Sequence, residues 1–112
     1  MSTALVLVKY TDAAKQGIVA EGGYSSRVNN LTAAMEGVGG SLGDYWVCDS
    51  QEWDAAFFMT GPDNGPAFQA ALNTLNEASG HIAEWRVIPV APAADVDEQL
   101  AGLMGKAVKP PE

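Results

Sequence analysis

The chain has 112 residues, of which 47% are hydrophobic and 18% charged, and its formal net charge is −8. This size and composition are typical of one globular domain and exclude a disordered chain. The few, scattered basic residues argue against nucleic-acid binding, no apolar run reaches the ~20 residues of a membrane span, and a single cysteine excludes an intrachain disulfide.

A strand and a loop are predicted first. The run Thr3–Tyr10 (TALVLVKY) is apolar and rich in residues that favour strands. Thr11, Asp12 and Gly17 then predict a loop. Because no basic region precedes an apolar run at the N-terminus, we expect no signal peptide and a cytoplasmic protein.

An amphipathic helix is predicted next, with Ser25 or Ser26 as its N-cap. Apolar residues recur at steps of three and four, as they do on one face of a helix: Val28, Leu31, Met35 and Val38. Gly39 and Gly40 end the helix, since glycine takes the left-handed conformation that helix ends favour.

Two further runs, Leu42–Cys48 and Trp53–Thr60, predict a hairpin closed by a short turn at Asp49–Gln51. Along Trp53–Thr60 neither alternating face is clearly polar. We therefore expect both faces of this strand to be at least half buried.

The second half repeats the pattern of helix and strand. Asp63 or Asn64 is a predicted N-cap, and Gly80 is the predicted end of the helix. The strand Ile82–Val90 follows, with Pro89 expected near its end or on a sheet edge. A short helix is predicted over Asp95–Lys106. The apolar face of the helix before Gly80 consists of Phe68, Ala71, Leu72 and Leu75.

This order predicts an α+β fold, a ferredoxin-like βαββαβ arrangement with both helices on one face of an antiparallel sheet. We expect one domain over residues 1–92 and a C-terminal tail with a short helix over residues 93–112. The other sheet face is left uncovered, and a second copy of the chain is the partner expected there, giving a homodimer.

Three segments resemble the GYD domain family, small dimeric α/β-barrel proteins with a ferredoxin-like fold: the opening LVLVKYT, the stretch Gln51–Asp54, and Thr60–Asp63. Asp54 matches the aspartate of the family signature. Trp53 stands where the family has tyrosine, and Gln51 stands where it has glycine. The resemblance covers residues 3–90 and implies a fold and a dimer more than an activity. Related dimeric barrels place ligands between sheet and helices, or within the barrel.

Three residues are candidate catalytic groups. Asp54, in a mostly apolar strand, is a candidate general acid or base, with hydrogen bonding to the Asp49–Gln51 turn as its structural alternative. His81 is a candidate proton shuttle, a haem or metal ligand, or an exposed turn residue. Arg86 would select an anionic or carbonyl substrate, or pair with Glu84, two residues before it on the same strand face.

Aromatic residues are the candidate ligand-binding groups: Tyr10, Tyr24, Trp46, Trp53 and Trp85. Tyr10, Tyr24 and Arg27 can together form a pocket mouth, and the tryptophans can instead belong to the core or a dimer interface. With one histidine and one cysteine, no zinc site of the usual spacing forms within one chain, and no cofactor is expected.

The function predicted from these residues is binding of a small planar or apolar organic molecule in an aromatic cleft. An enzymatic form of it would be a cofactor-independent isomerase, cyclase or monooxygenase. The alternative is a non-catalytic dimeric module that regulates or assembles with another protein. Sheet packing without a cleft would favour that alternative.

Overall fold

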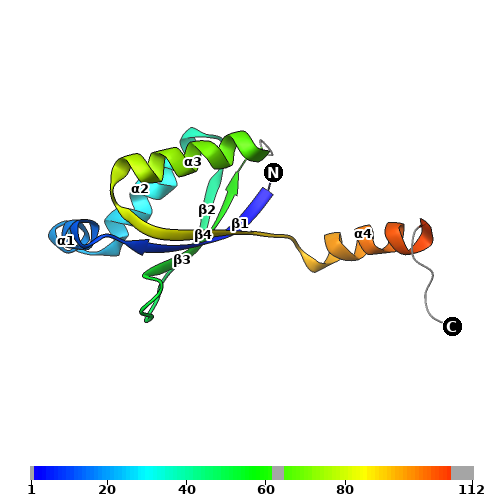
Figure 1. Ribbon diagram of the computed structural model, residues 1–112, viewed down its shortest axis with the longest axis horizontal. Helices are drawn as coiled ribbons and strands as arrows, with labels where there is room; N and C mark the ends of the chain where they lie inside the picture. Colours follow the sequence, from blue (N-terminus) through cyan, green and yellow to red (C-terminus); the bar gives the residue numbers. More distant parts are fainter. Residues whose placement is uncertain (1, 62–64, 107–112) are drawn as a thin grey trace.

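The computed structural model describes residues 2–61 and 65–106 and forms an α+β protein with a four-stranded antiparallel sheet (Figure 1). The elements in chain order are β1 (Ser2–Tyr10), α1 (Asp12–Ala20), α2 (Tyr24–Gly37), β2 (Ser41–Val47), β3 (Ala55–Gly61), α3 (Gly65–Ser79), β4 (Ile82–Val90) and α4 (Ala93–Lys106). The four predicted strands and the three predicted helices are all present. The proposed caps Asp63 and Asn64 lie outside the described residues.

The sheet has the strand order β2-β3-β1-β4, and every neighbouring pair is antiparallel. The two central strands are therefore β1 and β3. Pro89 lies in β4, an edge strand, opposite Ala4 of β1 and close to the strand's end, as predicted. At an edge its missing N–H costs no hydrogen bond between strands.

One face of the sheet carries the core. Alternate residues of the central strands are buried on this face: Val6, Val8 and Tyr10 of β1, with Ala55, Phe57 and Met59 of β3. Both α2 and α3 lie over this face in Figure 1. The prediction that both helices of the repeat cover one side of the sheet is confirmed.

None of the helices in the described part of the chain covers the opposite face in Figure 1. Its central rows include Leu5 opposite Phe58 and Ile88, and Leu7 opposite Ala56. Trp46 of β2 also faces this side, opposite Ala56, and is 62% exposed. The second face thus mixes these apolar residues with Arg86, opposite Leu7, and with Glu84, opposite Lys9, and it is only half buried within one chain.

The predicted loop after β1 is wrong, because Asp12–Ala20 form the helix α1. Thr11 caps it: its side-chain hydroxyl accepts a hydrogen bond from the Ala14 N–H at 3.2 Å. Ala14 and Ile18, four residues apart, bury one face of the helix. Gly17 suggested a loop, but one glycine is tolerated when an N-cap and an apolar face support the helix.

The start of α2 also differs from the prediction. Its N-cap is Gly23, at φ 129°, and no side chain caps the helix. Ser26 instead donates a hydrogen bond through its hydroxyl to the Glu21 carboxylate at 2.8 Å. The predicted end is confirmed, since Gly39 has φ 77° just beyond the helix.

The connection between β2 and β3 is longer than the predicted turn. It spans residues 48–54, so β3 begins at Ala55 rather than at Trp53. The backbone of Asp54 links two strands: its carbonyl accepts from Cys48 N–H at 2.9 Å, and its N–H donates to the Val8 carbonyl at 2.8 Å.

The C-terminal helix α4 extends away from the rest of the chain (Figure 1). With α4 included, the structure measures 62 × 30 × 21 Å. The helix begins two residues before the predicted start. Its apolar residues Val96, Leu100 and Leu103 remain about half exposed. Among the described helices, none combines the length and apolar character needed to cross a membrane.

Candidate functional site

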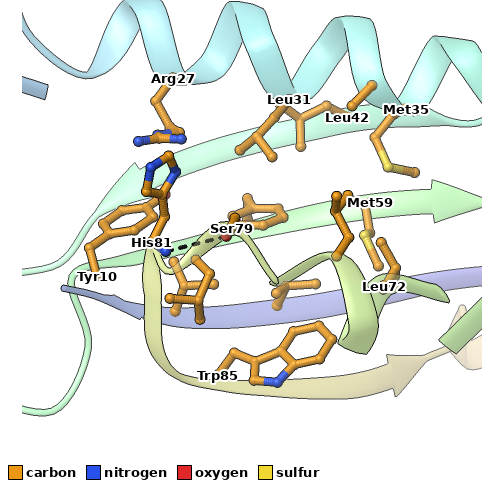
Figure 2. A pocket seen from close by; sticks show the side chains of 16 residues that line it. Tyr10, Arg27, Leu31, Met35, Leu42, Met59, Leu72, Ser79, His81 and Trp85 are labelled. Atoms are coloured by element: carbon orange, nitrogen blue, oxygen red, sulfur yellow. Dashed lines mark hydrogen bonds between the residues drawn. The ribbon is translucent and has the colours of Figure 1, made fainter. Parts of the chain in front are cut away.

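A cavity of about 280 Å³ lies between the core face of the sheet and the helices α2 and α3 (Figure 2). Its walls are mostly apolar because the alternating strand residues and the helix faces both point into the same layer. The lining residues are Val6, Val8, Tyr10, Arg27, Leu31, Ala34, Met35, Leu42, Phe57, Met59, Leu72, Leu75, Ser79, His81, Ile82 and Trp85.

The polar lining residues gather at one end of this cavity. Figure 2 shows Arg27, Tyr10 and His81 close together there, while Met35, Met59 and Leu72 lie at the other end. The Arg27 guanidinium carbon lies 5.4 Å from the centre of the Tyr10 ring, a cation–π contact. A ligand in the cavity would therefore meet an apolar body and one cationic, hydrogen-bonding end.

Two hydrogen bonds donated by Thr11, the residue after Tyr10, hold the turn that carries His81. The Thr11 N–H donates to the His81 carbonyl at 3.0 Å, and the Thr11 hydroxyl donates to the Gly80 carbonyl at 3.0 Å. The turn itself requires Gly80, which has φ 68°. One threonine thus caps α1 and fixes the turn that carries His81 to the cavity.

Tyr10 forms a hydroxyl pair with Tyr45 of β2. Their oxygens are 2.7 Å apart, so one hydroxyl donates to the other. The Tyr45 ring stacks on Phe57 with centroids 5.5 Å apart, and it packs at a tilt against Tyr24 at 6.4 Å. Burial raises the pKa of both phenols above the ordinary value of 10.0, and the hydrogen bond with Tyr10 raises that of Tyr45 further. Both hydroxyls are therefore neutral donors at neutral pH.

These raised pKa values predict an alkaline loss of stability. The unfolded chain releases phenolic protons near pH 10 whereas the folded chain keeps them, so the free energy of unfolding falls as pH rises above about 10. The slope is at most about 1.4 kcal/mol per pH unit for each phenol. Urea unfolding between pH 9 and 12 measures it, and the double variant Tyr10→Phe, Tyr45→Phe should give a shallower slope. Equal slopes would contradict this assignment.

Asp54 does not line the cavity, and its carboxylate has a structural environment instead. One carboxylate oxygen, Oδ2, accepts from the Tyr10 N–H at 2.9 Å, and Oδ1 pairs with Lys15 Nζ at 3.3 Å. The side chain is 17% exposed. Asp54 therefore joins the start of β3 to the end of β1 and to α1, rather than bonding to the Asp49–Gln51 turn.

The other predicted site residues fall into three places. His81, Tyr10 and Trp85 line the cavity. Trp53 and Arg86 line a second, more open hollow of about 540 Å³, together with Trp85 and two glutamates, Glu52 and Glu84. Trp46 lies on the uncovered sheet face, and Tyr24 packs against Tyr45 outside the cavity lining. Arg86 and Glu84 form no ion pair within the described part of the chain.

The charged group in the apolar cavity is Arg27, which the sequence analysis placed with Tyr10 at a pocket mouth, whereas Arg86 lies outside this cavity. Arg27, Leu31 and Met35 are spaced by four and so share one face of α2. Tyr45 was missed as a partner of Tyr10. Only the pairing of β2 with β3, which sets Tyr45 opposite Phe57, brings it there.

Among residues 2–61 and 65–106, no group of three or more histidine, cysteine, aspartate or glutamate residues could hold a metal ion. The geometry is that of an apolar cavity with one cationic end. Comparison of the chain with protein-family models, with curated proteins and with solved structures gives no match.

Proposed function

We propose that the chain is a small-molecule-binding protein whose site is the cavity between the sheet and the helices α2 and α3. The observation that carries the proposal is the combination of about 280 Å³ of apolar space with a polar end at Arg27, Tyr10 and His81. Binding sites for small organic molecules are typically apolar clefts with a few convergent polar groups. A cavity of about 150 Å³ accommodates benzene, so this one suits a ligand of roughly ten non-hydrogen atoms.

The fold part of this proposal is a ferredoxin-like domain of the GYD type that pairs as a dimeric α/β barrel. The strand order β2-β3-β1-β4 and the position of α2 and α3 on one face support it. Exposed apolar residues on the other face support pairing of two sheets: Trp46 is 62% exposed, and Phe58 and Ile88 are each 38% exposed. Burying such a face against a second copy would remove apolar surface from water.

Proton transfer is the chemistry that the polar end could add to binding. His81 contributes an imidazole, a side chain that commonly serves as a proton shuttle. The Tyr10–Tyr45 pair supplies a neutral donor, which stabilises an oxyanion as it forms. A cofactor-independent isomerase or cyclase needs these two kinds of group and an apolar enclosure.

Native mass spectrometry of the protein purified from its own host tests binding and pairing in one spectrum. We expect a dimer with additional mass corresponding to one small molecule per chain. In the variant Ala34→Trp a bulky ring fills the cavity, so the additional mass should disappear. The matched control Ala33→Trp, one residue earlier on α2 and outside the lining, should keep it.

The outcomes separate the two parts of the proposal. A dimer that carries no ligand would favour the non-catalytic interaction module. Additional mass retained equally by Ala34→Trp would place the ligand elsewhere and contradict the cavity as its site. A monomer would remove the dimer and leave the uncovered sheet face unexplained.

A further inference from the structure

The cavity contains an arginine whose hydrogen-bonding capacity is not used by the protein. The Nε of Arg27 is buried and has no hydrogen-bond partner. Buried N–H groups without a partner are rare in folded proteins, because a buried donor that bonds to nothing is costly. The Nε–H of Arg27 therefore lacks an acceptor within the protein, and a bound ligand could supply one.

No carboxylate of the described residues forms an ion pair with Arg27. The carboxylate of Asp54, which accepts from the Tyr10 N–H, pairs with Lys15 instead. The guanidinium is instead held against the Tyr10 ring, at 5.4 Å from its centre. This contact fixes the position of the guanidinium without satisfying its N–H groups.

A second donor lies at the same end of the cavity. The hydroxyls of Tyr10 and Tyr45 carry two protons, and their mutual hydrogen bond uses one of them. One O–H therefore remains for another acceptor. When Tyr45 donates to Tyr10, this is the O–H of Tyr10, which lines the cavity. A guanidinium and a spare phenolic hydroxyl together match an oxygen group that has one negative charge and several lone pairs.

The opposite end of the cavity excludes a ligand that is polar throughout. Met35, Met59 and Leu72 line it, and Leu31 lies between the two ends (Figure 2). The overall charge of −8 also gives no general attraction for anions. The cation at the cavity end is thus local, and a single charge favours a monoanion over a phosphate dianion.

From these observations, and resting on the proposed binding function, we infer that the ligand class is a monocarboxylic acid with an apolar body, its carboxylate bound by Arg27 and the Tyr10–Tyr45 pair. The apolar body lies along α2 toward Met35. Arginine forms planar, two-pronged hydrogen bonds with carboxylates, which supplies orientation as well as affinity.

Isothermal titration calorimetry with two probes of equal chain length tests the inference at pH 7. Octanoate carries the carboxylate, and octan-1-ol carries a neutral hydroxyl on the same chain. We expect octanoate to bind the wild-type protein about ten- to hundredfold more tightly than octan-1-ol. This comparison needs no variant, so it stands even if a substitution disturbs folding.

Two substitutions then locate the selectivity. Arg27→Gln should weaken octanoate binding by about tenfold or more and leave octan-1-ol within about twofold. The matched control Arg86→Gln changes an arginine outside the cavity and should alter neither affinity. Circular dichroism of each variant confirms that it is folded.

The results separate this inference from the proposed function. Equal affinity for the two probes would overturn the acid as ligand class while the binding function stands. Equal weakening of both probes by Arg27→Gln would also overturn it, because Arg27 would then only shape the cavity. Binding of neither probe would count against the cavity as a binding site and against the inference with it.

Discussion

Replacement of Gly40 by alanine is expected to destabilise the fold by about 3 kcal/mol, at the upper end of the range for overpacking. Gly40 lies between α2 and β2, where its Cα approaches the end of β3. A methyl group there would collide with the Thr60 carbonyl oxygen and would lie 2.9 Å from the Met35 Cε and 3.3 Å from the Gly61 Cα. Two of these three atoms belong to the backbone of a central strand, so they cannot move aside cheaply.

Urea unfolding followed by circular dichroism, at one protein concentration, measures the loss. The matched control is Gly17→Ala in α1, where no atom lies within 4 Å of the new methyl group and the backbone is helical. This substitution should stabilise the protein by about 0.5–1 kcal/mol through the lower flexibility of alanine. If both variants had similar stability, the close approach of Gly40 to β3 would be wrong.

Replacement of Asp54 by alanine is expected to cost about 3 kcal/mol of stability. The substitution removes a charged acceptor from the Tyr10 N–H and leaves that backbone donor without its partner. It also removes the ion pair that ties α1 to the sheet through Lys15. Because the carboxylate is only 17% exposed, water replaces these contacts poorly.

The stability contributed by the hydrogen bond to Tyr10 and the stability contributed by the ion pair with Lys15 can be measured separately. Lys15 is 44% exposed, so Lys15→Met should cost no more than about 1 kcal/mol. Asp54→Asn keeps an acceptor oxygen and should lie between the two. Thermal and urea unfolding measure all three variants. A loss for Asp54→Ala no larger than that for Lys15→Met would mean that the hydrogen bond to Tyr10 contributes nothing.

Asp54 also affects the candidate site, although it does not line it. Its carboxylate holds the backbone of Tyr10, and the Tyr10 ring lies under the Arg27 guanidinium. The residue that sequence reasoning considered as an acid or base thus supports a wall of the cavity from outside. In the proposed function its substitution would disturb ligand binding through the position of Tyr10.

Much of the architecture follows from local patterns in the sequence. Short apolar runs rich in strand-favouring residues predict β1 and β3, and steps of three and four predict the buried face of α2. Gly39 and Gly80 mark helix ends because both need positive φ angles. These features depend on neighbouring residues alone, so they can be read from the sequence without knowledge of distant contacts.

Local patterns were insufficient where a distant contact decides the structure. The helix α1 was predicted as a loop from Gly17, although burial of Ala14 and Ile18 supports it as a helix. The strand β3 starts at Ala55 rather than at Trp53, and the Asp54 backbone before it bonds to Cys48 and to Val8, which is 46 positions away in the chain. The pattern of residues 53–60 does not indicate these partners, whereas the spacing of Ala14 and Ile18 by four is a local signal of α1.

The sequence by itself therefore determined the strands, two covering helices and the α+β class. The tertiary structure decided which side chains meet in the cavity, since Tyr10, Arg27 and His81 come from β1, α2 and the turn before β4. The physical reason is the distance along the chain over which the deciding contacts act. Secondary structure depends on neighbours a few residues apart, whereas a site depends on strand register and helix packing between remote segments.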